Sequence, residues 1–549
     1  MKRWWFEILV ASIVLVNVLS NLTTLRLDLT TDRRYTLSAT TRELLRSLSS
    51  PIEASLYLNG ELNSGFRLLR STTKQTIEEM AHYANIKFSE VKTQELTEQQ
   101  IKELNTALER EQLHPTAIYE TNRHGKSSQT IVYPFIKLTA HGKTVWVNLL
   151  ENQRGLSGAE NLNNSQEYLE YKLGEAIYLL GEEEPEKIAF IEGQGELPEQ
   201  NTADIEQALS KYFAVYRGTI TQDVQCLSPF AAIIFADPQL PFTEADKYII
   251  DQYLMHGGKA LWCVNGVQFS QNVLTDQGFT PVLPLDLNLT DLFFRYGVRV
   301  NAHLLQDRQC LPVPVDVSQN PDIPQYQPMP WYYNPMLLTS SQSAITRNLT
   351  AVSAPFCSDI EAVGKGERLN YDILLATSDA ARIIPIPAEV RLSETYADPS
   401  LFTYSYLPVA MAVEGIFNSH FTHRMQPDGL SGRIDKLTES VPTRQVFIAA
   451  GSVPRNELQN GNTLPAGYDR YSHLQPGNRD MIVNSILWLT DKKGLINLRQ
   501  KTIPLRLLND KLLQQKLTSY QAISILTPLL LIALIALIVN LTYKKTYTT

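Results

Sequence analysis

Apolar and polar residues alternate in short runs in the first part of the chain, and longer stretches with helical spacing separate these runs. Pro51–Asn59 alternates like a half-buried strand, and Gly65–Ala84 places apolar side chains at helical intervals. A second helix is predicted over Thr97–Leu113, because Thr97 can cap it and an acidic residue follows in its first turn. The runs IKFSEV, TAIYET, QTIVYPFIKLTA and KTVWVNLL supply further predicted strands.

These patterns predict an α/β fold built from two units. The order of elements over residues 51–155 resembles a thioredoxin-like arrangement, but without a CxxC pair it implies no redox activity. Over residues 156–500, apolar strands such as KIAFIEG, AAIIFADP and KALWCVN alternate with helices, which predicts a parallel sheet covered on both faces. A Pro-rich insertion near residues 311–336 interrupts this unit, and YDILLATS, PVAMAVEG and QVFIAAG are expected to rejoin the sheet.

Both ends of the chain carry an uncharged apolar stretch. Ala522–Tyr543 would extend about 33 Å as a helix, enough to cross the hydrocarbon core of a bilayer. Ile8–Leu25 follows Lys2 and Arg3 and lacks a good cleavage site, which favours an uncleaved anchor. The predicted segments are an N-terminal transmembrane anchor at 4–25, a juxtamembrane segment at 26–50, a linker at 501–519 and a C-terminal transmembrane helix at 520–543.

Two spans place both tails on the same side of a membrane. The short tails are basic, so the positive-inside rule assigns them to the cytoplasm. We therefore expect a two-pass protein of the inner (cytoplasmic) membrane, with both termini cytoplasmic and the main domain in the periplasm. Membrane lipid is accordingly an expected partner.

Charge and cysteine content exclude some partners and chemistries. The net charge is −8 and no basic block is present, whereas nucleic-acid binding needs clustered Lys and Arg, so nucleic acid is not an expected partner. None of the four cysteines has CxxC spacing for zinc or redox chemistry. Cys310 and Cys357 could pair in an extracytoplasmic domain, or both could stay free.

The sequence lacks motifs for catalysis and for cofactor binding. MHGGKA and RHGKSS miss the leading glycine of a GxxxxGK[ST] loop, and EGQGELP has Pro198 in place of the third glycine of GxGxxG. There is no GxSxG elbow, and Cys263 falls within a predicted strand. His420 and His423 have the spacing of a metal pair, but they lack a third ligand and are interpreted as part of a polar loop. We expect no catalytic residue, no cofactor and no metal.

Polar residues at the ends of the predicted parallel strands are candidates for a ligand or partner rim. The carboxyl ends of parallel strands share one edge, where open α/β sheets bind ligands. The candidates are Glu192, Gln194, Glu196, Asp237 and Asn265. Alternatively, these residues only cap strands and form turns.

Seven longer segments carry a resemblance to one family. They are LDLTTDRRYTLSATTRELL, LENQRGLSGAENLNNSQEYLEY, KIAFIEGQGEL, PFTEADKYIIDQYLMHGGKALW, NLTDLFFRYGVRVNAHLLQD, PMPWYYNP and NRDMIVNSILWLTD. Together they resemble the gliding-motility-associated ABC-transporter auxiliary (GldG-like) proteins of Bacteroidetes. The resemblance implies a non-enzymatic, membrane-anchored, substrate-binding-like accessory subunit that works with a separate ATPase and permease. Other motility or secretion components are further candidate partners.

The same resemblance implies a class I glutamine-amidotransferase-like, flavodoxin-like fold for residues 156–500. The segment VFIAAGSVPRN departs from the acidic turn expected at this strand, so no site is carried over there. Two alternative functions stay open. One is a periplasmic solute-binding subunit with its ligand in the sheet-edge cleft. The other is a hydrolase of amidotransferase-like fold, which needs a nucleophile with a nearby base.

Two short segments are candidate partner contacts. The first follows the N-terminal span and contains Arg33, Arg34 and Tyr35. This segment is expected to couple the anchor to the domain or to contact the permease. Alternatively, it is only a polar linker. Ser38 could cap the helix that follows. The second contains Trp331, Tyr332 and Tyr333. These aromatics would form a partner anchor if exposed, since aromatics dominate interface hot spots, whereas packing onto their own domain is the alternative.

Overall fold

The computed structural model describes residues 36–547 with short gaps. The residues left out are 1–35, 49, 112, 122–126, 152–156, 182–183, 317, 319–324, 348, 364–367, 492–493, 495, 497–509 and 548–549. The predicted N-terminal anchor and the candidate contacts Arg33, Arg34 and Tyr35 therefore lie outside the described residues. The chain divides into two units, Met1–Thr502 and Ile503–Thr549.

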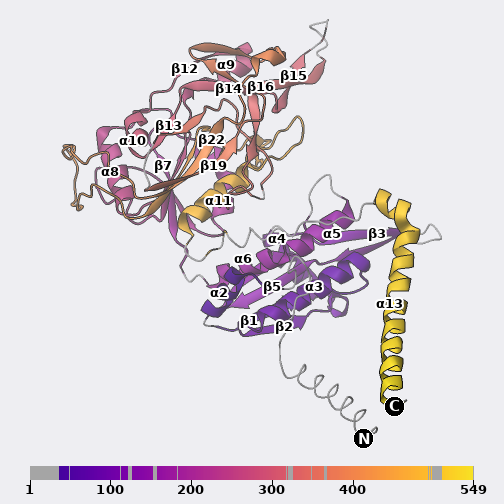
Figure 1. Ribbon diagram of the computed structural model, residues 1–549. Coiled ribbons are helices and arrows are strands. Elements are labelled where there is room, and N and C mark those ends of the chain that lie inside the picture. The colour runs from indigo at the N-terminus through magenta and orange to yellow at the C-terminus, as the bar shows by residue number, and fades with distance from the viewer. Residues whose placement is uncertain are drawn as a thin grey trace. The chain divides into compact units, whose positions relative to one another are not determined.

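The first unit begins with a four-stranded sheet (Figure 1). Its elements are α2 (Ala39–Ser47), β1 (Ile52–Leu56), α3 (Ser64–Met80), β2 (Ile86–Glu90), a 3-10 turn (Thr93–Glu95), α4 (Glu98–Arg110), β3 (Thr116–Thr121), β4 (Ser127–Val132), β5 (Phe135–Ala140), β6 (Lys143–Asn148), α5 (Gly158–Glu167) and α6 (Leu169–Gly181). The strand order is β2-β1-β5-β6, with β2 parallel and β5 antiparallel to β1. Strands β3 and β4 pair only with each other among the described strands.

Local sequence signals set the helix starts in this part. The Ser38 hydroxyl accepts a hydrogen bond from the Thr41 N–H at 3.1 Å, as predicted for the cap of α2. Thr97 forms a capping box with Gln100 at the start of α4, which confirms the predicted start. The run QTIVYPFIKLTA is two strands rather than one, because Pro134 has no N–H to donate to a ladder.

A ten-stranded sheet forms the larger part of the first unit. Its central elements are β7 (Lys187–Glu192), α7 (Ala203–Leu209), β8 (Ala214–Thr219), β9 (Ala232–Ala236), α8 (Glu244–Met255), β10 (Ala260–Cys263), α10 (Thr290–Arg295), β22 (Pro408–Gly415), β23 (Thr443–Ile448) and α11 (Asn478–Thr490). The order is β15-β16-β19-β22-β23-β10-β9-β7-β8, and β17 pairs with β16. Strands β8, β7, β9, β10 and β23 are parallel, which confirms the predicted parallel sheet.

The strands expected to rejoin the sheet do so: β23 pairs in parallel with β10, and β22 and β19 extend the sheet in antiparallel order. β23 pairs with β22, β22 with β19 (Leu369–Ala376) and β19 with β16 (Tyr326–Thr339). The Pro-rich insertion is the hairpin of β15 (Cys310–Asp316) and β16. The remaining short elements are β11 (Val267–Gln268), α9 (Gln271–Gln277), β12 (Phe279–Pro284), β13 (Val298–Val300), β14 (His303–Asp307), β17 (Val352–Ser353), β18 (Ile360–Ala362), β20 (Ala381–Pro385), β21 (Ala388–Arg391), β24 (Leu458–Gln459), β25 (Asn462–Thr463) and 3-10 turns at Glu199–Asn201 and Pro399–Leu401.

The parallel strands form the core of this sheet. Every residue of β9 and β10 is buried, as expected for strands that are covered on both faces. Trp262 of β10 stacks on Phe235 of β9 with ring centroids 4.1 Å apart and meets Phe293 of α10 edge-on at 5.0 Å. Helix α11 lies against β9, β10 and β23. The carboxyl ends of β9 and β10 thus follow directly from a buried, closely packed core.

The second unit contains helix α13 (Asp510–Tyr547), with Pro528 inside it. Side chains are described along it mainly from Gln521 to Leu537, and the large apolar ones in this stretch are exposed. Among the residues that the structure describes, no helix is both long enough and apolar enough to cross a membrane.

Candidate functional site

The predicted rim residues follow strands that end at the same edge of the large sheet. Glu192 ends β7, Asp237 directly follows β9, and Asn265 lies two residues beyond β10. β10 pairs in parallel with both β9 and β23, so the segment after β23 reaches the same edge. Sequence reasoning did not select Gly451 in that segment, but it completes the arrangement.

Asp237, Asn265 and Gly451 form a connected hydrogen-bond network. The Asn265 side-chain amide donates to Asp237 Oδ1 at 2.7 Å, and the Gly451 N–H donates to Asn265 Oδ1 at 2.8 Å. Asp237 has a φ of 60°, in the left-handed region that aspartate tolerates better than most residues. A Cβ atom at position 451 would lie 2.0 Å from Asp237 Oδ1, so only glycine fits there.

Gln194 and Glu196 belong to a turn that packs against the segment after β9. The Gln194 carbonyl accepts from the N–H groups of Gln239 and Leu240 at 2.7 and 2.8 Å. The Glu196 carboxylate accepts from the Gln194 N–H at 2.8 Å. One side-chain oxygen of each residue, Gln194 Oε1 and Glu196 Oε1, is buried without a hydrogen-bond partner among the described residues. Most polar groups of this turn are thus hydrogen-bonded, but these two side-chain oxygens are not.

Glu192 is held by an ion pair that faces α7. Arg217 of β8 donates from Nε to Glu192, from Nη1 to the Thr202 hydroxyl and from Nη2 to the Leu197 carbonyl, each at 2.8 Å. Arg217 also bonds Glu206 of α7. These contacts assign Glu192 a structural role at the end of the strand.

Burial changes the protonation of the rim carboxyls. It raises the pKa of Asp237 from 3.8 to about 7, although the charge of Arg455 and the hydrogen bond from Gln239 oppose the rise. Burial also raises the pKa of Glu196, against backbone N–H groups that favour its charged form. Asp237 is therefore a group that titrates near neutral pH.

Cys263 lacks the properties of an activated nucleophile. Its side chain is fully buried in β10, and burial together with the nearby Asp237 raises the pKa of its thiol. A nucleophilic cysteine needs a lowered pKa and access to substrate. All four cysteines are free, so Cys310 and Cys357 do not pair in this structure.

A small cavity adjoins Asn265. Its volume is about 80 Å³, and its lining includes Asn265, Leu287, Thr290 and Arg299. Pockets that hold small organic ligands measure about 300–1,000 Å³. This cavity can hold a few water molecules.

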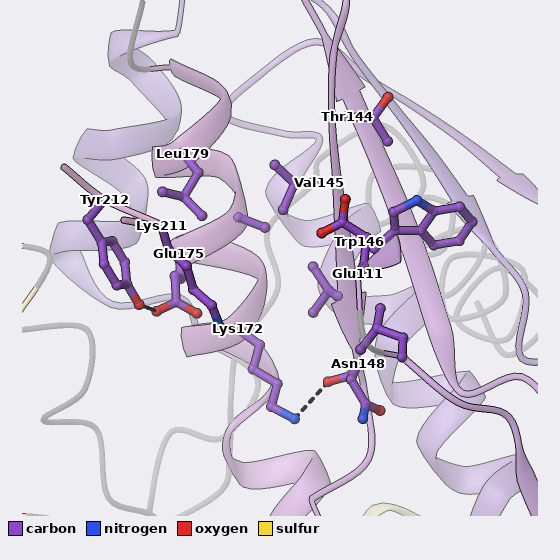
Figure 2. Close-up of a pocket in the computed structure, with 13 residues that line it drawn as sticks. Glu111, Thr144, Val145, Trp146, Asn148, Lys172, Glu175, Leu179, Lys211 and Tyr212 are labelled. Carbon is purple, nitrogen blue, oxygen red and sulfur yellow. Dashed lines mark hydrogen bonds between the residues drawn. The ribbon is translucent and has the colours of Figure 1, made fainter. Parts of the chain in front are cut away.

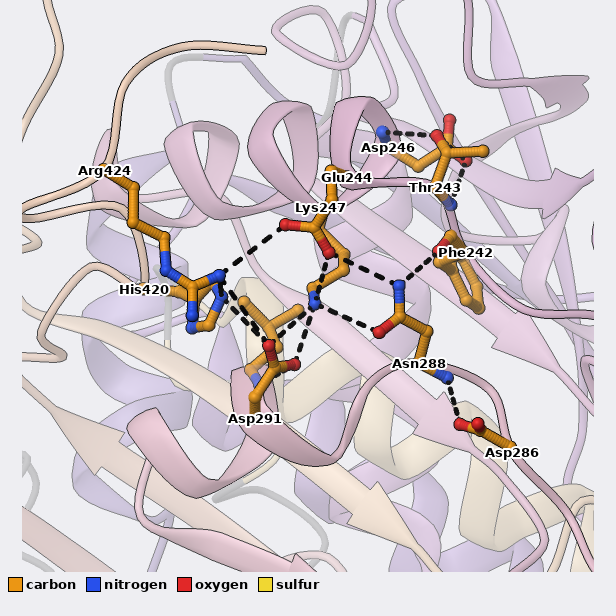
Figure 3. Close-up of polar contacts among 11 residues, drawn as sticks. Phe242, Thr243, Glu244, Asp246, Lys247, Asp286, Asn288, Asp291, His420 and Arg424 are labelled. Carbon is orange, nitrogen blue, oxygen red and sulfur yellow. Dashed lines mark hydrogen bonds and ion pairs between the residues drawn. The ribbon is translucent and has the colours of Figure 1, made fainter.

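A second polar cluster, which the sequence did not reveal, surrounds the buried amino group of Lys247 on α8 (Figure 3). Lys247 Nζ lies 2.8 Å from Asp291 Oδ1 and 2.9 Å from Glu244 Oε1. His420 Nε2 lies 3.2 Å from the same Asp291 carboxylate, and Arg424 contacts it at 3.8 Å. A buried ammonium requires such partners, so the cluster connects α8, α10 and the loop at His420.

His420, one of the two candidate histidines, belongs to the Lys247 cluster, where its Nε2 faces the Asp291 carboxylate. Burial is the main cause that lowers the pKa of His420, while the Asp291 carboxylate opposes it. No group of three His, Cys, Asp or Glu side chains suited to a metal ion is found within the described part of the chain.

The aromatic candidates pack onto their own domain. Trp331 and Tyr333 are 4% and 2% exposed and belong to a small hydrophobic cluster with Phe356. Tyr332 is half-buried and packs on Phe402, with ring centroids 5.3 Å apart. Burial leaves Trp331 and Tyr333 without the exposed surface that a partner anchor needs, so the structure favours the packing alternative.

Comparison with known proteins shows which families the chain resembles. The family model described as "ABC-type uncharacterized transport system" matches residues 185–485, and a domain of unknown function matches residues 31–139. No curated protein matches the chain significantly. The solved structure titled "mmIFT52 N-terminal domain" is 14% identical, covers 56% of this chain and 97% of its own, and superposes with a TM-score of 0.31, too low to support an argument.

The match to the transport-system model covers more than half of the 549 residues. It includes every strand of the large sheet, the Asp237 rim and the Lys247 cluster. The chain belongs to the ABC-transporter auxiliary family.

Proposed function

We propose that the protein is a non-catalytic accessory subunit of an ABC transporter that works with a separate ATPase and a separate permease. The observation that carries the proposal is the family match over residues 185–485. The sequence has no GxxxxGK[ST] loop, as expected of a subunit that relies on another chain for ATP hydrolysis. The Cys263 thiol is buried in β10 and its pKa is raised, so it lacks the activation that a hydrolase nucleophile needs.

We further propose that the chain is anchored in the inner membrane at both ends, with its main body in the periplasm. The uncharged stretches Ile8–Leu25 and Ala522–Tyr543 and the basic residues beside them support this orientation. The exposed apolar side chains of α13 would find an apolar environment in lipid. Alkaline phosphatase fused after residue 200 tests the topology, because it is active only outside the cytoplasm.

The sequence resemblance extends the proposal to gliding motility in Bacteroidetes. It also supports the names expected for the two α/β parts. The order β2-β1-β5-β6 has the strand directions of a thioredoxin-like sheet, and the parallel order β8-β7-β9-β10-β23 has the 2-1-3-4-5 pattern of flavodoxin-like sheets. Deletion of the gene in a gliding bacterium, followed by complementation, tests the motility role. Unchanged gliding in the deletion strain would contradict it.

Affinity purification of the full chain from native membranes tests the accessory role. We expect a nucleotide-binding ATPase and a multi-spanning permease to co-purify. Arg33→Ala/Arg34→Ala should reduce recovery of the permease if the juxtamembrane segment contacts it, whereas Arg67→Ala/Lys74→Ala, on the surface of α3, should not. Recovery of the chain without either transporter component would contradict the accessory role.

A further inference from the structure

Strand β6 is an outer strand of the four-stranded sheet, and no described strand pairs with its free edge. In its ladder with β5, Ala140 lies opposite Lys143, and the Leu149 N–H donates to the Pro134 carbonyl at 2.8 Å. Antiparallel strands alternate between pairs that exchange hydrogen bonds and pairs that do not. By this alternation, Thr144, Trp146 and Asn148 direct their backbone N–H and C=O groups away from β5.

These outward backbone groups are largely unpaired. The Asn148 carbonyl accepts a hydrogen bond from Lys172 Nζ at 2.7 Å, which confirms that this residue faces outward (Figure 2). Apart from the ladder with β5, the backbone groups of Thr144 and Trp146 have no backbone hydrogen bond to a described residue. An edge with unpaired N–H and C=O groups is a template on which another strand can pair.

The free edge of β6 opens into a groove whose walls come from other segments of the chain. The groove has a volume of about 460 Å³, within the range of ligand pockets. Figure 2 shows β6 beside α6, which carries Lys172, Glu175 and Leu179. The rest of the lining comprises Ala176 of α6, Lys211 and Tyr212 after α7, and Glu111 and Leu113 after α4. This shape suits a narrow chain, whereas the edge of a second copy would bring its own covering helices against these walls.

The walls also indicate what kind of chain fits. Successive side chains of an added strand point to opposite faces. One set would meet the apolar side chains of Ala176 and Leu179, and the other would meet Trp146, whose ring packs 5.1 Å from that of Tyr57. Lys211 is an exposed lysine of the lining, where Glu111 and Glu175 also lie, and it makes no ion pair with a described residue.

We propose that β6 is a site of β-strand addition for an extended peptide segment of another subunit of the transport complex. The segment pairs its backbone with Thr144 and Trp146, places apolar side chains toward α6 and carries an acidic side chain for Lys211. The identity of the partner rests on the proposed function, whereas the pairing geometry rests on β6 alone.

The test uses the full chain in its native membrane with the photo-crosslinker p-benzoylphenylalanine in place of Glu111, an exposed residue of the groove wall. Thr144→Pro removes an outward N–H without removing a bond to β5, because proline is tolerated on the free side of an edge strand. Thr144→Val keeps that N–H and is the matched control. Mass spectrometry maps the cross-linked segment.

We expect the cross-link to map to one segment of a permease, an ATPase or another transporter subunit. Its yield should fall about tenfold in Thr144→Pro and stay unchanged in Thr144→Val. An unchanged yield in Thr144→Pro, a cross-link to β6 of a second copy, or no cross-link while the permease still co-purifies would each overturn the proposal. A cross-linked segment from a protein outside any transporter, lost in Thr144→Pro, would keep the pairing site and contradict the proposed function.

Hydrogen exchange gives a second measurement that does not depend on a variant that folds. In the isolated wild-type chain, the amides of Thr144 and Trp146 should exchange fast and those of Val145 and Val147 slowly. In the purified transport complex, the amides of Thr144 and Trp146 should become slow as well. Fast exchange of both amides in the complex would overturn the proposal.

Discussion

Asp237→Asn isolates the effect of one buried carboxyl on stability. Burial raises the pKa of Asp237 from 3.8 to about 7, so between these pH values the folded protein keeps a proton that the unfolded chain releases. Stability is therefore lost as pH rises through this window. The pKa shift from 3.8 to about 7 corresponds to a loss of about 4 kcal/mol in the free energy of unfolding. Asparagine carries no charge, tolerates the φ of 60° and keeps an oxygen that accepts from Asn265.

Thermal unfolding of the full chain in detergent, followed by tryptophan fluorescence, measures this effect. At pH 4, close to the unfolded-state pKa of 3.8, the wild type and Asp237→Asn should unfold at similar temperatures. At pH 8 the variant should unfold up to about 6 °C higher, because a domain of about 300 residues gains that much from about 4 kcal/mol. The same difference at both pH values, or a difference that shrinks as pH rises, would refute the reasoning.

Three further substitutions test other parts of the structure. Gly451→Ala should lower the free energy of unfolding by about 1–3 kcal/mol in thermal unfolding, because the added Cβ meets Asp237 Oδ1. Gly218→Ala, which has open space around it, is the control and should cost less than about 1 kcal/mol. Equal losses would contradict the steric conflict at position 451. Ser38→Ala should destabilise α2 by about 1 kcal/mol, read as faster hydrogen exchange there, and unchanged exchange would argue against the cap. Asp291→Ala should lower the free energy of unfolding by about 3 kcal/mol, because the buried Lys247 amino group loses one of its carboxylate partners. A loss below about 1 kcal/mol would show that Glu244 alone can stabilise the buried charge.

The sequence predicted the parts of the structure that depend on local patterns. Ser38 and Thr97 cap helices because a side-chain oxygen before a helix accepts from its first N–H groups, a rule that needs no tertiary information. Asp237 and Asn265 were correctly grouped because parallel strands end at one edge.

Contacts between segments far apart in the chain could not be predicted. Gly451 is required because Asp237 Oδ1 occupies the space of its Cβ, and AAGSVP gives no sign of that neighbour. The ion pair of Lys247 with Asp291 joins two helices whose packing follows from the whole sheet. Trp331 and Tyr333 are buried because the Pro-rich run forms a β-hairpin of the large sheet. From its composition alone, this run was predicted to be an insertion that leaves the sheet.

The assembly of the protein in its own membrane is the most direct measure of the central claim. Native mass spectrometry of complexes released from bacterial membranes gives the subunits bound to the intact chain. The accessory role predicts an ion that contains this chain together with an ATPase and a permease in fixed ratio. Ions of the chain alone or only of its own multimers, from membranes in which the ATPase and permease are detected as a separate complex, would contradict it.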